Sequence, residues 1–203
     1  MPTIDLYTWG TPNGLKPILM LEELGVPYTL KPINIGKGDQ HEPAYRAINP
    51  NGKIPAMVDG EAGVTIFESG AVLQYLAEKH GRFLPPTTAD RMQAMSWLFF
   101  QVGGVGPMFG QATHFVTRDD SPYAKKRYLD EVERLYAVLD KRLSEAPFLA
   151  GAEYSIADIA TWTWVRDPTR LGLSLDRWPS VQQWAARIAE RPAVQRTLAI
   201  KFG

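Results

Sequence analysis

The sequence contains no cysteine among its 203 residues and only three histidines, His41, His80 and His114. The lack of cysteine excludes structural disulfides, cysteine-ligated metal centres and a protein thiol nucleophile within these residues. The histidines stand far apart and never at the i, i+4 spacing of a helical zinc pair, so we expect no protein-bound metal.

An excess of charge of either sign is also missing, because 22 basic residues balance 22 acidic residues. The chain therefore offers no general basic surface for a phosphate backbone, and we do not expect nucleic acid as a partner. No run approaches the roughly 20 apolar residues of a membrane span. The N-terminus has neither the basic start nor the apolar core of a signal peptide. We therefore expect a cytoplasmic protein that does not bind membranes.

What the sequence does have is 45% hydrophobic and 22% charged residues, the balance of a globular protein with a core. Its first part is rich in short strand and helix signals. The strands are predicted at Thr3–Tyr7, Tyr28–Ile33, Ala56–Val58 and Val64–Phe67, and the helices at Leu15–Leu24 and Ser69–His80. This order of strand, helix, strand and then strand, strand, helix predicts an α/β domain.

Beyond Pro85 the strand signals disappear and helical patterns take their place. Helices are predicted at Asp90–Phe100, Tyr123–Leu143, from Ser155 onward and over 178–188. Ser155 and Asp158 form a capping box, so Ser155 should be the N-cap of its helix. Gly103–Gly106, followed by Pro107, predicts a helix break or close helix packing. We place the boundary near residues 83–88, which gives domains 1–84 and 89–203.

The string Gly10-Thr11-Pro12-Asn13-Gly14 stands between the first strand and the first helix. Alone it is a polar turn with a helix cap. In an open α/β sheet, however, ligands bind beyond the carboxyl ends of strands, close to helix N-termini. There the Thr11 hydroxyl and the Asn13 amide can donate hydrogen bonds to an anion. A thiolate suits this site, since a free thiol has a pKa of about 8.5 and two hydrogen bonds to a charged group can lower it by roughly one to two units.

Two more strings stand beside predicted strands. Asn49–Pro55 reads as a turn, but a proline entering a strand suggests a special geometry. A cis Ile54–Pro55 bond would free the Ile54 main chain to pair with an extended peptide. Phe67–Ala71 opens a helix that Ser69 can cap. The helix N-terminus also suits a carboxylate, and Glu68 can accept from an ammonium, so one amino-acid end of a ligand would satisfy both.

Taken together and in order, these strings resemble the thioredoxin-like half of glutathione transferases, and the capping box resembles their helical half. The strings most similar to the bacterial Nu class, known as glutathione-dependent disulfide-bond oxidoreductases, are Thr11–Gly14, Gly36–Gly38, Pro50–Pro55, Phe67–Ala71, Gln101–Met108 and Tyr154–Ala160. The resemblance covers essentially the whole chain. It implies the glutathione transferase fold, in which an α/β thioredoxin-like domain precedes an all-α domain.

The resemblance also implies a role for each matching residue. Thr11 and Asn13 would be the catalytic pair that faces the glutathione sulfur. The glutathione-binding positions would be Asn13, Gln40, Lys53, Ile54, Glu68, Ser69 and Arg127. Gln40 and Lys53 would contact the tripeptide, and Ile54 would pair with its cysteinyl part. Glu68 and Ser69 would hold the γ-glutamyl end, and Arg127 would reach glutathione from the helical domain. Tyr7, by contrast, lies within the first strand and is interpreted as a packing residue.

The implied activity is reduction of small disulfides, with reduced or oxidised glutathione as co-substrate, no metal and a homodimeric protein. The same activated thiolate serves an alternative activity, conjugation of glutathione to small electrophiles. A second alternative is a non-catalytic glutathione transferase-like binding protein. The motif residues do not separate the two activities, and they do not say whether one or two glutathiones bind. The intact set of Thr11, Asn13, Ile54-Pro55 and Glu68-Ser69 argues against the binding protein, which has no need of all of them.

Overall fold

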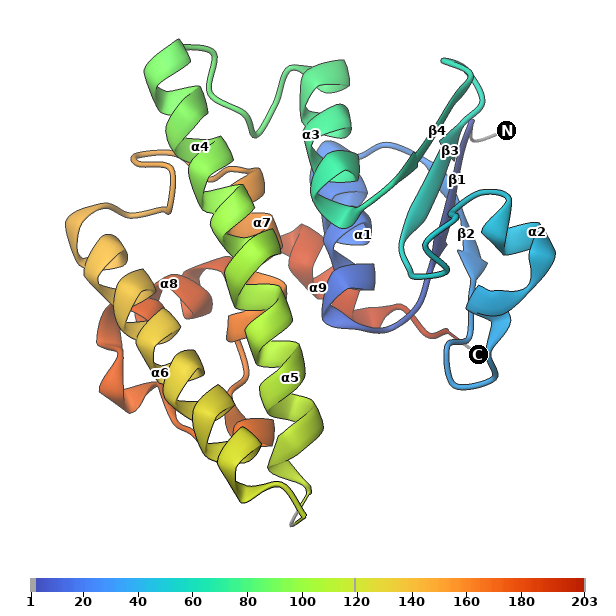
Figure 1. Ribbon diagram of the computed structural model, residues 1–203. Coiled ribbons are helices and arrows are strands. Elements are labelled where there is room, and N and C mark those ends of the chain that lie inside the picture. The colour runs from blue at the N-terminus through green and yellow to red at the C-terminus, as the bar shows by residue number, and fades with distance from the viewer. Residues whose placement is uncertain (1–2, 119, 203) are drawn as a thin grey trace. The chain divides into compact units, whose positions relative to one another are not determined.

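A computed structural model describes residues 3–118 and 120–202, which form two compact units (Figure 1). The first unit comprises residues 3–82 together with 191–202, and the second comprises 83–190. The domain boundary at residues 83–88 stays a prediction. Residues 191–202, which we had assigned to the helical domain, pack with the first unit. Within the described ranges, no helix is both long and apolar enough to cross a membrane.

The first unit is built on a four-stranded mixed sheet in the order β2-β1-β3-β4. Its strands are β1 (Ile4–Thr8), β2 (Tyr28–Pro32), β3 (Ala56–Asp59) and β4 (Val64–Phe67). Strand β2 runs parallel to β1, whereas β3 runs antiparallel to both β1 and β4. Each strand lies within about one residue of its predicted position. The predicted α/β arrangement is therefore confirmed.

Four helices complete this unit: α1 (Pro12–Leu24), α2 (Pro43–Arg46), α3 (Ser69–His80) and α9 (Pro192–Ala199). Figure 1 shows α1 and α3 on one face of the sheet and α2 beyond the other face. Ile18 to Leu21 of α1 are fully buried, and so are Val72, Leu73 and Leu76 of α3. The buried faces of α1 and α3 thus form the core against the sheet.

The second unit is all helical. Its helices are α4 (Thr88–Phe100), α5 (Gly106–Val116), α6 (Pro122–Glu145), α7 (Ile156–Val165) and α8 (Pro179–Ala189). The predicted helix over Tyr123–Leu143 is confirmed as α6, and its apolar face is buried, since Val132, Leu135, Tyr136 and Leu139 are at most 1% exposed. The predicted capping box is also confirmed at the start of α7, with Ser155 as N-cap and Asp158 as its partner.

The predicted helix break at Gly103–Gly106 is wrong. The chain passes from α4 to α5 through a π-helical segment, Gln101–Val105, and Pro107 lies in the first turn of α5. A proline needs no backbone N–H there, so it does not interrupt the helix. The alternative expectation, close helix packing, is confirmed. A Cβ at Gly106 or Gly110 would lie 3.6 or 3.5 Å from the Trp164 ring.

Candidate functional site

The strand register of the first unit gathers the predicted motifs at one edge of its sheet. Tyr7 pairs with Ala56, and Ala56 pairs with Phe67 on its other side. Because β3 runs antiparallel to β1 and β4, the chain leaves β1, enters β3 and leaves β4 at the same end. The residues that follow Thr8, precede Ala56 and follow Phe67 are therefore neighbours. These are the stretches that contain Thr11 and Asn13, Ile54 and Pro55, and Glu68 and Ser69.

Thr11 is the N-cap of α1, and its Oγ1 accepts a hydrogen bond from Gly14 N at 3.2 Å. A hydroxyl has one donor in addition to its acceptor sites, so the Thr11 O–H can still donate to a ligand. Asn13 follows in the first turn and is half-buried. Gly14 allows the helix to start this close to the strand, since a Cβ there would lie 1.9 Å from Trp9 O. The structure therefore places both predicted donors at the positive end of α1.

The loop before β3 is held by two hydrogen bonds to one of its backbone carbonyls. Tyr45 Oη and Asn49 Nδ2 both donate to Lys53 O at 2.6 Å. Burial raises the pKa of Tyr45 to about 12, so its hydroxyl stays a donor at physiological pH. The next peptide bond, Ile54–Pro55, is cis. Neither the N–H nor the carbonyl of Ile54 is hydrogen-bonded within residues 3–118 and 120–202, while the Lys53 side chain is exposed.

Gln40 lies in a 3₁₀ turn, Asp39–His41, that follows β2. Its Nε2 is 3.1 Å from His41 Nε2. Its Oε1 is buried and has no hydrogen-bond partner among the described residues. Buried polar atoms are nearly always paired. An acceptor left open in this way is a place where a ligand donor, such as an amide or an ammonium, would complete the hydrogen bonding.

Glu68 and Ser69 begin α3 in different environments. Glu68 is exposed and has a φ of 71°, a backbone conformation uncommon for a residue with a side chain. Such conformations often mark binding sites. Ser69 is only 6% exposed, and its Oγ is 3.1 Å from Lys16 Nζ of α1. This hydrogen bond joins the beginning of α3 to the second turn of α1.

Lys16 is a residue that our sequence analysis did not single out. Its side chain is 1% exposed. Burial lowers the pKa of Lys16 to about 7, against the opposing effect of the Glu68 charge. One signal was present in the sequence. Lys16 stands on the same helical face as Met20, four residues later, which is fully buried.

The side chain of Tyr7 packs as predicted. It is half-buried in β1, and its ring centroid lies 6.3 Å from that of Tyr45. Across the described part of the chain, no group of three or more His, Asp or Glu side chains is arranged to hold a metal ion.

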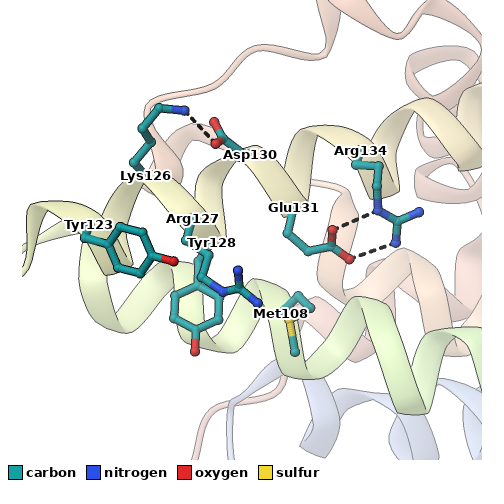
Figure 2. A pocket seen from close by; sticks show the side chains of 8 residues that line it. All are labelled: Met108, Tyr123, Lys126, Arg127, Tyr128, Asp130, Glu131 and Arg134. Atoms are coloured by element: carbon teal, nitrogen blue, oxygen red, sulfur yellow. Dashed lines mark hydrogen bonds and ion pairs between the residues drawn. The ribbon is translucent and has the colours of Figure 1, made fainter.

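Arg127 belongs to the second unit, where it lies on α6 and lines an open hollow of about 740 Å³ (Figure 2). The other residues of this hollow are Met108, Tyr123, Lys126, Tyr128, Asp130, Glu131 and Arg134. Lys126 pairs with Asp130 at 2.6 Å, and Arg134 pairs with Glu131 at 2.7 Å. Arg127 is exposed and forms no ion pair with any residue of the described ranges. Its guanidinium is therefore open to an anionic ligand.

Comparisons with known proteins agree with this geometry. The family model for the N-terminal domain of glutathione S-transferase matches residues 2–78, and the model for the C-terminal domain matches residues 105–192. The disulfide-bond oxidoreductase YfcG of Escherichia coli (strain K12) is 49% identical over 202 residues, which cover 96% of this chain and 94% of that protein.

Two solved structures are also similar. A glutathione transferase from Burkholderia graminis, with two glutathione molecules bound per subunit, is 40% identical at a TM-score of 0.91. The match covers 100% of this chain and 90% of the Burkholderia graminis chain. A glutathione transferase from Pseudomonas putida, with one glutathione disulfide per subunit, is likewise 40% identical at a TM-score of 0.91. The match covers 98% of this chain and 92% of that one.

Proposed function

This chain belongs to the glutathione S-transferase family, and we propose that it is a glutathione-dependent disulfide-bond oxidoreductase of the Nu class. The proposal takes its reaction from the 49% identical oxidoreductase and its co-substrate from the two neighbours that bind glutathione or its disulfide. Thr11 and Asn13 hold the sulfur of glutathione as a thiolate. The tripeptide then lies along the sheet edge at which the three motifs of the first unit gather.

Each group of site residues is assigned one part of glutathione. The Ile54 N–H and carbonyl pair with the cysteinyl backbone, since both are open among the described residues. Glu68 accepts from the γ-glutamyl ammonium, and Ser69 donates to the neighbouring carboxylate. Gln40 and Lys53 contact the remaining polar groups, and the open Gln40 Oε1 is the acceptor for an N–H of the ligand.

The reaction proceeds by two thiol–disulfide exchanges. A glutathione thiolate attacks one sulfur of the substrate disulfide, which forms a mixed disulfide with glutathione and releases the first substrate thiolate. A second glutathione thiolate attacks the glutathione sulfur of this mixed disulfide. The products are oxidised glutathione and the second substrate thiolate, and each released thiolate takes up one of the two protons lost by glutathione. Two electrons pass from two glutathiones to one disulfide.

The observation that carries this proposal is the combination of a hydroxyl donor at the N-terminus of α1 with a chain that has no cysteine. The Thr11 oxygen is occupied by Gly14 N, which leaves its O–H to donate at the N-terminus of α1. Because these 203 residues supply no sulfur nucleophile, the stabilised thiolate comes from the ligand. Every mixed disulfide then forms between glutathione and substrate.

A paired assay tests the proposal. The purified protein is supplied with glutathione and a small disulfide, with oxidised glutathione formation coupled to glutathione reductase and NADPH. Conjugation of glutathione to chlorodinitrobenzene is measured beside it. We expect strong disulfide turnover and weak conjugation. The reverse result would assign the chain to the conjugating transferases. Glutathione binding without turnover in either assay would identify a binding protein.

Arg127 gives a second test of the binding assignment. We expect Arg127→Met to raise KM for glutathione about three- to fivefold with kcat nearly unchanged, because an exposed ion pair contributes about 1 kcal/mol or less. The effect should shrink as salt is added. Lys126→Met is the matched control, since Lys126 lines the same hollow but is paired with Asp130. Equal changes in both variants would show a general charge effect and remove Arg127 from the site.

We also propose that the protein is a cytoplasmic homodimer. Support comes from α4, where Met92 is 51% exposed and Phe99 is 65% exposed. They are seven residues apart and therefore share one helix face, and large exposed apolar side chains of this kind favour association. A monomeric mass in sedimentation equilibrium would contradict the dimer.

A further inference from the structure

A buried lysine contacts Ser69, the residue proposed to bind the carboxylate end of glutathione. Lys16 Nζ donates to Ser69 Oγ at 3.1 Å, and the two residues are 1% and 6% exposed. Buried lysines are rare because removing an ammonium from water is costly. Lys16 is buried beside a proposed binding residue despite this cost, so we asked how it affects the ligand.

The hydrogen-bonding capacities of the two side chains set their roles. An ammonium has three donors and no acceptor, whereas a serine hydroxyl has one donor and two acceptor sites. While Lys16 is charged, the Ser69 oxygen must accept from it, and the Ser69 O–H must donate elsewhere. No residue of the described ranges accepts from that O–H. A hydrogen bond received by the oxygen also polarises the O–H and makes it a stronger donor.

The charges around Lys16 in the first unit identify Glu68 as its electrostatic partner. On β1, Asp5 is paired with Lys31. Arg191 and Arg196, at the start of α9 and within it, bind Glu23 and Glu22 in the last turn of α1, far from Lys16. The other charged groups of α3, Glu78, Lys79 and His80, lie in its last turn. The Glu68 charge therefore supports the ammonium form.

We infer that Lys16 is a positioning residue, whose ammonium orients the Ser69 O–H toward the α-carboxylate of the γ-glutamyl group. This inference rests on the proposed function, because Ser69 holds that carboxylate only if glutathione is the ligand. When Lys16 is neutral, its amine nitrogen has a lone pair that can accept a hydrogen bond from the Ser69 O–H. The O–H then points to Lys16 and not to the carboxylate. The carboxylate site is thus complete when Lys16 is charged and is weakened when it is neutral.

The inference predicts a proton linkage with a definite sign. Burial lowers the pKa of Lys16 to about 7 in the protein without ligand. A bound carboxylate favours the ammonium and raises that pKa, so binding takes up a proton at and above neutral pH. Affinity should be highest below the pKa that Lys16 has in the protein without ligand, and it should fall as the pH rises through that value.

Calorimetry on the unmodified protein tests this linkage with S-methylglutathione, in which the thiol cannot titrate. The titrations are made between about pH 5.5 and pH 7.5, below the pKa of about 7.7–8.0 of an α-amino group, in buffers of different ionisation enthalpy. We expect proton uptake of a fraction of one equivalent and an affinity that falls several-fold across this range. Binding with neither proton uptake nor pH dependence would overturn the inference and leave the proposed function standing.

A double-mutant cycle separates positioning from general stability. Lys16→Met and Ser69→Ala should each weaken S-methylglutathione binding by about tenfold, the size of one hydrogen bond to a charged group. If Lys16 acts through Ser69, the double variant should lose about ten- to thirtyfold rather than the hundredfold of independent effects. Lys31→Met, a half-exposed lysine of the same unit, is the control and should bind normally.

Each negative result of these experiments has a different meaning. Fully additive losses would show that Lys16 does not act through Ser69, and an unchanged Lys16→Met affinity would remove it from the site. If the unmodified protein does not bind S-methylglutathione at all, the proposed function and this inference both fail. Should Lys16→Met not fold, proton uptake by the unmodified protein decides the question.

Discussion

Replacing Thr11 and Asn13 together by alanine should lower kcat/KM for glutathione-dependent disulfide reduction by about three- to tenfold at neutral pH. Both side chains lie at the N-terminus of α1, where Thr11 is the N-cap. Without their donors the pKa of the bound thiol should return toward the free value of about 8.5. At pH 7 only a small fraction of the bound glutathione would then be a thiolate.

The expected loss is smaller than the change in thiolate fraction alone, for a chemical reason. A thiolate of higher pKa is a better nucleophile, with a Brønsted coefficient of about 0.4–0.5. The variant therefore has less thiolate, but each thiolate is more reactive. Its activity should approach that of the unmodified protein as the pH rises toward about 9. This convergence distinguishes a lost thiolate site from a lost binding site, whose effect would persist at every pH.

Single variants separate the two donors. Thr11→Ala also removes the cap to Gly14 N, which costs about 1 kcal/mol of stability. Thr11→Ser is its control, because it keeps both the hydroxyl and the cap. Asn13→Asp should be more harmful than Asn13→Ala, since a carboxylate beside the sulfur raises its pKa further. The ultraviolet absorbance of bound thiolate, titrated against pH, measures each shift directly. A double variant with unchanged activity and an unchanged thiol pKa would show that neither residue faces the sulfur.

The sequence was sufficient to predict most of the first unit because its signals are local. A turn before a helix, a proline before a strand and a capping serine are each visible within five residues. The strand register pairs Tyr7 with Ala56 and Ala56 with Phe67, and it thereby brings these local strings together at one edge of the sheet. The roles of the site residues stay predictions, but the structure brings the three motifs of the first unit to one edge of its sheet.

Lys16 escaped prediction because its environment is made by packing rather than by sequence neighbours. Its partner Ser69 is 53 residues away, and the burial that lowers its pKa exists only once α1 and α3 have packed. In a helical pattern, a lone lysine is usually assigned to the solvent side or to a snorkelling position. Helix α9 was missed for a similar reason. Pro192 opens an eight-residue helix whose Arg196 binds Glu22, 174 residues away.

The second unit depends on one buried carboxylate, and Asp158→Ala should be the most destabilising single change proposed for this chain. Asp158 is fully buried and accepts four hydrogen bonds, from Leu149 N, Trp184 Nε1, Ser155 N and Ser155 Oγ, at 2.9 to 3.1 Å. It thereby joins the first turn of α7 to α8 and to the turn after α6. Alanine would leave three buried N–H donors without an acceptor, because only the serine hydroxyl can rotate to another partner.

We expect Asp158→Ala to lower the free energy of unfolding by roughly 3–5 kcal/mol, since each unpaired buried donor costs about 1–3 kcal/mol. Asp158→Asn should lose less. Its oxygen can still accept from Leu149 N and Trp184 Nε1, and its amide can donate to Ser155 Oγ, so that only Ser155 N is left unpaired. Ser155→Ala removes the cap of Ala157 N and one hydrogen bond to Asp158, and should cost about 1–2 kcal/mol.

Urea unfolding followed by circular dichroism measures this series, and its order carries the argument. We expect Asp158→Ala to lose the most free energy of unfolding and Asp158→Asn to lose less. Ser155→Ala should lose as much as Asp158→Asn or less. If Asp158→Asn were as damaging as Asp158→Ala, the charge of the carboxylate would matter more than the number of donors it satisfies. If all three losses were below about 1 kcal/mol, the unit would have replaced these hydrogen bonds by water, which requires that the buried side chain become accessible. A graded series with an unchanged m-value would instead show that the variants lose stability in step with the hydrogen bonds they remove, with no change in the surface exposed on unfolding.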